Sequence, residues 1–333
     1  MTPSPVTVLY HADCLDGFGS AYAAWCRFED AANYRPMHHG EAWDLSDITG
    51  HTIYILDFSF APGMLERMAG IATTVIQIDH HTSALQAWAG RVALDGQRKV
   101  DFDHPALPLS IHFDLDKSGA RLAWEYFHPN KPVPLSIQHI EDLDMWRFAL
   151  PGTREYCRAL RLLPFDFATW HELISATADN KALRYAEMLT QGKAIETFFQ
   201  REVDRLSKSN LRMPARLRGE PIDVLQAVRH GQTVLSDGNS AWLAVPGLAI
   251  NAPVLFASEL GNRLAGQSEG IGLTWQLADD GDIKVSLRSQ GSAIDVSLIA
   301  ARYGGGGHPN AAGFRMPAAR FFSEVLAMNG TEH

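Results

Sequence analysis

Short apolar segments alternate with helix-patterned segments through the first quarter of the chain. Thr7–Tyr10, Ile53–Leu56 and Thr74–Ile78 are runs of four or five mostly apolar residues, rich in β-branched and aromatic types, which is typical of buried strands. Gly17–Phe28 repeats its apolar positions with helical spacing, and Pro62–Met68 also has a helical pattern. Strands that alternate with helices favour an α/β fold with a parallel, doubly wound sheet.

The rest of the chain predicts a long helix followed by a second, smaller domain. Asn180–Leu206 lacks internal proline and predicts one continuous helix. We therefore expect an N-terminal α/β domain over residues 1–178, a helical linker over 179–210, and a smaller mixed α/β domain over 211–333. Further strands are expected at Ile222–Val228, Ile271–Leu277 and Ile283–Leu287, and further helices at Gly119–Phe127, Leu135–Leu143, 166–177, Leu255–Leu264, Val296–Arg302 and Arg320–Met328. The pattern of residues 90–117 leaves that segment unassigned.

Acidic and imidazole side chains follow all three predicted N-terminal strands. The segment His11–Asp16 (HADCLD) follows the first strand, Asp57 follows the second, and Asp79-His-His81 closes the third. Because ligands bind outside the carboxyl ends of strands in an open parallel sheet, we expect these groups to meet at one edge. A single aspartate there is often only a helix cap, and adjacent histidines are common on surfaces. Three strand ends carrying such groups in order favour a shared site.

The donor types predict a metal centre. Several carboxylates brought together repel one another unless a cation lies between them. Carboxylate and imidazole ligands favour Mn²⁺ first, with Mg²⁺, Co or Fe next and Zn²⁺ as the alternative. A carboxylate such as Asp57 can bridge two ions about 3.5–4 Å apart, and such a pair activates water while it holds a phosphoryl group. We therefore expect two divalent ions.

The chain resembles the DHH phosphoesterase superfamily. Its motifs are matched by HADCLDG (His11–Gly17), LDFS around Asp57, the triplet Asp79-His80-His81, IEDLDMW (Ile140–Trp146), SLRS (Ser286–Ser289) and GGGGHPNAAG (Gly304–Gly313). These matches follow the family's order over nearly the whole chain. The resemblance implies a catalytic DHH domain at 1–178 and a DHH-associated, substrate-binding domain at 211–333.

The resemblance also implies roles for single residues. The ligands implied for one metal are His11, Asp13 and Asp57. Those implied for the other are Asp16, Asp57, His80 and Asp142, with Asp144 as the alternative to Asp142. Asp57 and His81 would be catalytic, and His81 would contact the scissile phosphate. Two residues separate Asp13 from Asp16 where many relatives have one, so Asp13 is alternatively a looser ligand or a residue behind the ligands.

A glycine run near the C-terminus predicts substrate binding. Consecutive glycines let a ligand approach the backbone closely, and the N–H groups of such a loop bind anions. With the family match, Arg288 is expected to pair with a phosphate. The other expected substrate-binding residues are Gly305, Gly306, Gly307, His308 and Asn310.

Composition narrows the class of partner. A net charge of −9 argues against binding to duplex DNA. It favours a small phosphorylated substrate or a short single-stranded oligonucleotide as the ligand. No apolar run reaches the roughly 18 residues of a membrane span, and the N-terminal residues do not resemble a signal peptide. Three separated cysteines without a CxxC pair fit a reducing compartment, so we expect a cytoplasmic protein. The oligomeric state stays open.

The leading hypothesis is a metal-dependent phosphoesterase that hydrolyses a phosphodiester or phosphomonoester of a short nucleotide. The substrate would be an oligoribonucleotide, a dinucleotide or a nucleoside bisphosphate. One alternative is an exopolyphosphatase-like hydrolase. The other is a metal-dependent nucleotide-binding protein without catalysis, which the altered spacing after Asp13 would allow.

Overall fold

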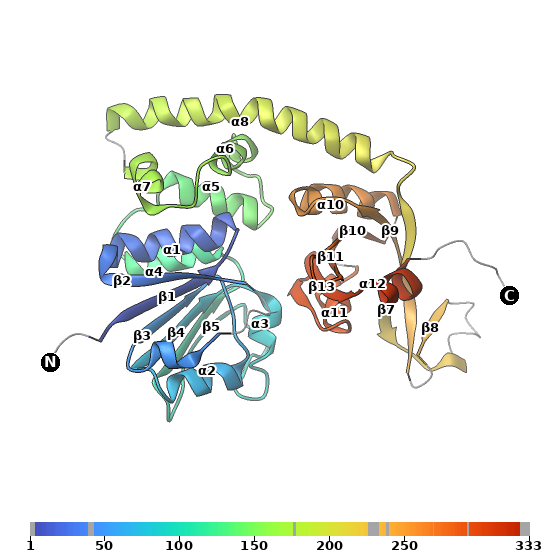
Figure 1. Ribbon diagram of the computed structural model, residues 1–333, viewed down its shortest axis with the longest axis horizontal. Coiled ribbons are helices and arrows are strands. Elements are labelled where there is room, and N and C mark those ends of the chain that lie inside the picture. The colour runs from blue at the N-terminus through green and yellow to red at the C-terminus, as the bar shows by residue number, and fades with distance from the viewer. Residues whose placement is uncertain are drawn as a thin grey trace. The chain divides into compact units, whose positions relative to one another are not determined.

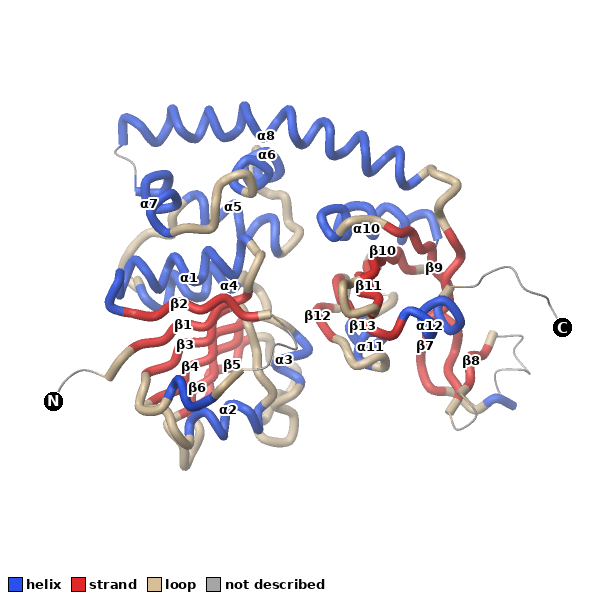
Figure 2. The backbone as a smooth tube through the Cα atoms, viewed as in Figure 1, coloured by secondary structure: helices blue, strands red, loops and turns tan. Residues whose placement is uncertain are grey.

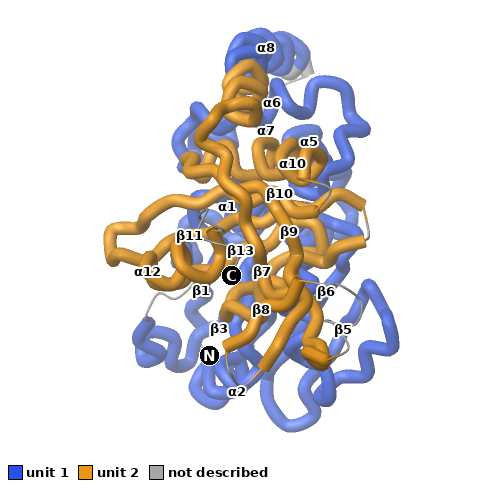
Figure 3. The backbone as a smooth tube through the Cα atoms, turned by 90° about the vertical axis from the view of Figure 1, so that its right-hand side faces the viewer, with its two compact units in different colours: residues 1–198 blue, residues 199–333 orange. Residues whose placement is uncertain are grey.

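The computed structural model describes residues 4–38, 43–175, 178–225, 233–237, 240–268, 270–291 and 293–326. The chain forms two compact units, residues 1–198 and 199–333, coloured separately in Figure 3. The boundary lies inside the long helix α8 (Ala178–Ser207). The division into two domains with a separate linker stays a prediction.

Unit 1 contains a six-stranded sheet in the order β2-β1-β3-β4-β6-β5. Its strands are β1 (Val6–His11), β2 (Ala32–Met37), β3 (Thr52–Leu56), β4 (Thr74–Asp79), β5 (Lys99–Asp103) and β6 (Leu109–Asp114). All neighbouring pairs are parallel except β5 and β6. β5 runs antiparallel because only the short 104–108 connection joins it to β6, and a parallel pair needs a longer crossover.

Helices cover both faces of this sheet (Figures 1 and 2). The helices of unit 1 are α1 (Leu15–Phe28), α2 (Pro62–Ala69), α3 (Thr82–Gln86), α4 (Gly119–Phe127), α5 (Leu135–Asp144), α6 (Thr153–Leu160), α7 (Phe167–Ser175) and most of α8. Successive strand residues enter opposite cores: Val8 packs in the cluster with α1 and α4, and Leu9 packs in the cluster with α2. Two covered faces explain why these strands are continuously apolar. The predicted α/β class and doubly wound sheet are confirmed.

Unit 2 is a mixed α/β structure around a sheet in the order β12-β13-β11-β10-β9-β7, with β8 paired to β9. Its strands are β7 (Met213–Pro221), β8 (Val234–Ser236), β9 (Ala241–Asn251), β10 (Ile271–Leu277), β11 (Asp282–Ser289), β12 (Gly306–His308) and β13 (Ala311–Pro317). Its longer helices among the described residues are the end of α8, α10 (Ala257–Ser268) and α11 (Val296–Ala301), and the short α12 (Ala318–Arg320) continues into a π-helical turn (Phe321–Val325). The smaller mixed α/β fold predicted here is confirmed.

The strand predicted over Ile222–Val228 is wrong for the residues that the structure describes. Ile222 and Asp223 lie outside the strands, and Val224 and Leu225 are helical, while 226–228 fall outside the described residues. The strand of this region is β7, which ends at Pro221. The pairing of β7 with β9 shifts register between Arg218 and Pro221, and Pro221 has no N–H to donate, so the regular ladder ends just before the apolar run.

Candidate metal centre

The carboxyl ends of β1, β3 and β4 lie side by side in the sheet and carry the predicted acids and histidines. His11 is the last residue of β1, Asp57 follows β3, and Asp79 is the last residue of β4. The strands are in register, with Tyr10, Leu56 and Ile78 as neighbours. Asp57 has a left-handed backbone (φ 50°), a conformation that aspartate and asparagine tolerate better than most residues.

His80 lies at the centre of three carboxylates. Its Nε2 is 3.2 Å from Asp57 Oδ1, 3.5 Å from Asp16 Oδ2 and 3.6 Å from Asp144 Oδ2. Asp57 also lies 3.7 Å from His11 Nδ1 through its other oxygen. Asp16, Asp57 and His80 are each at most 2% exposed, so this charge is concentrated in a buried space.

The pKa values of Asp16 and Asp57 shift in opposite directions. Burial and the charges of Asp57 and Asp144 raise the pKa of Asp16 well above its ordinary value. Burial alone would also raise the pKa of Asp57, but contacts with His11 and His80 outweigh it and lower that pKa. A cation would relieve this repulsion, so the donor set fits a divalent metal.

The N-terminus of α4 fixes the position of Asp16. The backbone N–H groups of Gly119 and Ala120 donate to the two oxygens of the Asp16 carboxylate at 2.6 and 2.9 Å. A carboxylate at a helix N-terminus also benefits from the helix dipole. Ser118 caps the same helix by accepting from Arg121 N, so the structure gives this serine the capping role.

Substitution of Gly119 by alanine is expected to disrupt the centre. A Cβ at position 119 would lie 2.5 Å from Asp57 Cβ and 2.8 Å from Asp57 Oδ1. We expect a loss of about 1–3 kcal/mol in the free energy of unfolding and weakened metal binding. Gly63→Ala in the first turn of α2 is the matched control, because nothing lies within 4 Å of the added methyl there. Thermal unfolding and metal titration of both variants test this, and wild-type metal binding by Gly119→Ala would contradict it.

Asp79 orients His81. The buried Asp79 accepts from His80 N at 2.8 Å, lies 2.7 Å from His81 Nδ1 through the same oxygen, and accepts from Ser59 Oγ through the other. Burial alone would raise the pKa of Asp79, but His81 outweighs it and holds that pKa at about 2. The first residue of the triplet therefore positions the third.

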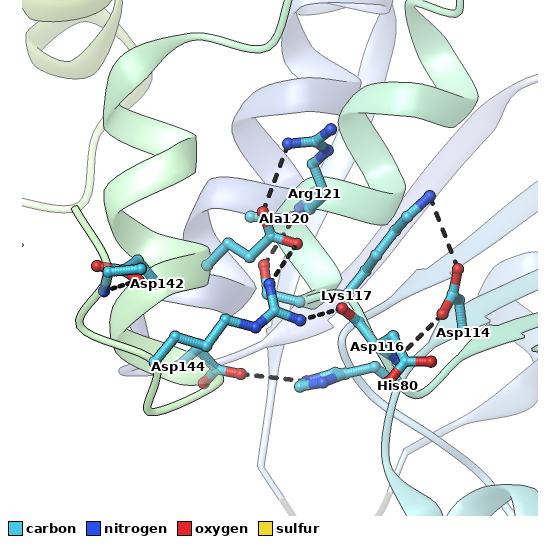
Figure 4. Close-up of polar contacts among 12 residues, drawn as sticks. His80, Asp114, Asp116, Lys117, Ala120, Arg121, Asp142 and Asp144 are labelled. Atoms are coloured by element: carbon cyan, nitrogen blue, oxygen red, sulfur yellow. Dashed lines mark hydrogen bonds and ion pairs between the residues drawn. The ribbon is translucent and has the colours of Figure 1, made fainter. Parts of the chain in front are cut away.

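Two of the implied ligands have side chains directed away from this cluster, and the first is Asp142. Its carboxylate turns back on its own chain, where it accepts from Ala149 N at 2.8 Å, Leu150 N at 3.0 Å and Thr153 Oγ1. Asp144, two residues further along α5, points toward His80 instead (Figure 4). Asp142 organises the 145–153 connection, and Asp144 is the acid of α5 in the cluster.

The second of these implied ligands is Asp13. Its backbone is left-handed (φ 56°), its side chain is 87% exposed, and its carboxylate lies 3.9 Å from His38 Nδ1. Among the described residues, the groups of potential metal ligands in unit 1 do not include Asp13. They do include Cys14, whose sulfur lies with His11 and Asp57. The sequence analysis did not include Cys14 among the metal ligands, because it considered only oxygen and nitrogen donors.

Exchanging each α5 aspartate for asparagine separates these two roles. Asp142→Asn is expected to lower the free energy of unfolding by about 1–3 kcal/mol through its lost charge-assisted hydrogen bonds, with metal affinity unchanged. Asp144→Asn is expected to weaken metal binding and to leave stability without metal unchanged or higher, since it removes a charge beside Asp57 and Asp16. Chemical denaturation and metal titration test both. The opposite assignment of effects would restore Asp142 as the ligand.

The predicted substrate residues lie in unit 2. Arg288 on β11 donates to Ser258 Oγ at 2.8 Å and to Leu287 O, and no ion pair of its guanidinium occurs among the described residues. Burial lowers its pKa to about 10, so it remains charged at neutral pH. Asn310 instead accepts from Ser289 Oγ at 3.0 Å, which gives it a local structural contact.

The glycine run packs closely against β13. A Cβ at Gly305 would lie 2.0 Å from Gly313 O, and one at Gly307 would lie 2.5 Å from Ala311 O. Gly307 also has a positive φ of 142°. Gly306 and His308 belong to β12, which pairs with β13. Close strand packing is therefore sufficient to require glycine at Gly305 and Gly307, whether or not a ligand binds there.

Comparison with known families bears on this second unit. Residues 257–328, which include Arg288 and the glycine run, match the family model of the DHHA1 domain. This match lies wholly within unit 2. The triplet Asp79-His80-His81 lies outside this match and begins at the last residue of β4.

The chain also matches one curated viral sequence and several solved structures. It is 29% identical over 323 residues to the uncharacterized protein R106 of Acanthamoeba polyphaga mimivirus, and the match covers 92% of this chain but only 66% of that protein. A pGpG-specific phosphodiesterase, PggH from Vibrio cholerae, is 14% identical with a TM-score of 0.39, covering 95% and 94% of the two chains. RecJ from Thermus thermophilus in complex with Mn²⁺ is 15% identical with a TM-score of 0.43, covering 96% of this chain and 50% of RecJ. Among the described residues, no helix of this chain is both long and apolar enough to cross a bilayer.

Proposed function

We propose that this protein is a divalent-metal-dependent phosphoesterase of the DHH type that hydrolyses phosphoester bonds of short nucleotides. The observation that carries the proposal is the cluster in which the buried Asp16 and Asp57 and the partly exposed Asp144 surround the buried His80 Nε2 within 3.6 Å. Such a concentration of carboxylates is costly without a cation, and structures that need only stability rarely keep it.

The ligands divide between two positions that share Asp57. His11 and Asp57 would hold one divalent ion, and Asp16, Asp57, His80 and Asp144 would hold the other. When bound, such ions supply an activated water and Lewis-acid stabilisation of the phosphoryl oxygens. The N–H groups of Gly119 and Ala120 keep Asp16 oriented toward His80, so the protein contributes a preorganised donor set.

His81 would act on the substrate itself. Burial lowers its pKa, but the charge of Asp79 and their hydrogen bond outweigh this and raise the pKa above the ordinary imidazole value. With Nδ1 held against Asp79, the ring is oriented to donate a proton to the leaving oxygen. Asp79 stays ionised and stabilises the charged imidazole.

Unit 2 would bind the phosphorylated substrate. The guanidinium of Arg288 offers paired donors that match a phosphate, and its described contacts are to neutral oxygens. His308 and the glycine run would contribute further contacts. The net charge of −9 favours a short nucleotide over a long nucleic acid.

A panel assay tests the proposal. The full chain, loaded with Mn²⁺, would be incubated with linear and cyclic dinucleotides, nucleoside bisphosphates, short RNAs and polyphosphate, and the products measured. We expect turnover of at least one nucleotide and loss of turnover after chelation. Preferential release of phosphate from polyphosphate would favour an exopolyphosphatase instead. Tight nucleotide binding without turnover in Mn²⁺, Mg²⁺, Co²⁺ or Zn²⁺ would select a binding protein.

A further inference from the structure

The turn between β1 and α1 directs two neighbouring side chains in opposite directions. Asp13, with its left-handed backbone, projects into solvent beside His38. Cys14 has an extended backbone (φ −125°, ψ 139°), and its Sγ lies within 4.8 Å of both a ring nitrogen of His11 and a carboxylate oxygen of Asp57. At this turn, the thiol occupies the place that the resemblance gives to the Asp13 carboxylate.

Close packing fixes the direction of this turn. A Cβ at Gly17 would lie 2.1 Å from His11 O, so the first turn of α1 sits directly against the end of β1. Phe18 N donates to Cys14 O at 3.0 Å, which fixes Cys14 as the residue where the helix begins.

We propose that Cys14 is a ligand of the divalent metal that His11 and Asp57 hold, in place of Asp13. The inference rests on the metal centre proposed above. On binding, the S–H bond breaks, the proton passes to water, and the sulfur bonds to the metal without any change of oxidation state. One sulfur, one nitrogen and one oxygen donor suit Zn²⁺, Fe²⁺ or Co²⁺ better than Mg²⁺. The second position, with only oxygen and nitrogen donors, has no such preference for a soft metal.

Cobalt titration gives a direct readout that does not depend on activity. A thiolate bound to Co²⁺ produces a near-ultraviolet charge-transfer absorption that oxygen and nitrogen ligands do not produce. We expect this absorption in the wild-type chain and in Cys26→Ser, which makes the same chemical change at the other end of α1. Cys14→Ser is expected to lack the absorption and to bind one fewer tightly held ion. Asp13→Asn is expected to behave as wild type.

A second measurement on the unaltered protein covers the case in which Cys14→Ser fails to fold. Zn²⁺ is expected to protect Cys14 from alkylation, while the half-buried Cys26 reacts at the same rate with and without metal. Peptide mass mapping identifies the modified thiol.

The outcomes separate this inference from the metal centre itself. Cobalt binding without the sulfur absorption, no protection of Cys14, or loss of one ion in Asp13→Asn but not in Cys14→Ser would overturn the assignment of Cys14 and leave the metal centre standing. No binding of any divalent ion by the wild-type chain would overturn both.

Discussion

Replacing Asp57 by asparagine is expected to abolish turnover and metal uptake together. Asp57 contacts His80 through one oxygen and lies near His11 through the other, so it is the group shared by both metal positions. Asparagine keeps the shape and tolerates the left-handed backbone, but it removes the charge that a bridging ligand needs. We expect turnover to fall by about a thousandfold or more, which corresponds to roughly 4 kcal/mol of transition-state stabilisation. Steady-state kinetics and calorimetric metal titration measure the two effects.

The matched control is Asp95→Asn. Asp95 also has a positive φ (41°), and it is exposed, so this variant makes the same chemical and backbone change outside the cluster. It is expected to retain wild-type turnover and metal affinity. Wild-type metal uptake by Asp57→Asn would remove Asp57 as the bridging ligand.

His81→Gln is expected to lose about 10²–10⁴-fold in turnover while it keeps its metal affinity. His81 is held by Asp79 and would supply a proton to the leaving group. A loss of this size is what general acid catalysis typically contributes. The loss should be much smaller for a substrate with a good leaving group, such as a nitrophenyl phosphoester, because that leaving group needs no proton. Kinetics on both substrate types, with metal titration, test the assignment.

His112→Gln is the control for this variant. His112 on β6 also pairs through Nδ1 with an aspartate, Asp101 Oδ1 at 2.8 Å, but on the antiparallel edge of the sheet. It should retain turnover on both substrate types. An equal loss on both types in His81→Gln would indicate a role in substrate binding rather than proton donation.

Local patterns were sufficient to predict most of the elements around the site. The three strands β1, β3 and β4 and the helices α1, α4 and α5 were all expected near their observed positions, since their apolar residues repeat with the period of the element that they form. β5 and β6 were not predicted, because Lys99–Asp103 and Leu109–Asp114 mix charges with apolar residues at the edge of the sheet. β12 was not predicted either, because its glycines form a strand only through pairing with β13.

The sequence by itself determined the α/β class of the chain, and that acids and histidines at three strand ends share one region. The order of strand-end motifs contains that information, because parallel strands bring their carboxyl ends to one edge. Two choices between near neighbours depended on the tertiary structure. Asp142 and Asp144 differ by about 200° around a helix, so only the packing of α5 decides which carboxylate reaches His80. The backbone dihedral angles of one turn likewise decide whether Asp13 or Cys14 faces His11 and Asp57. Those angles depend on the close contact between Gly17 and the end of β1.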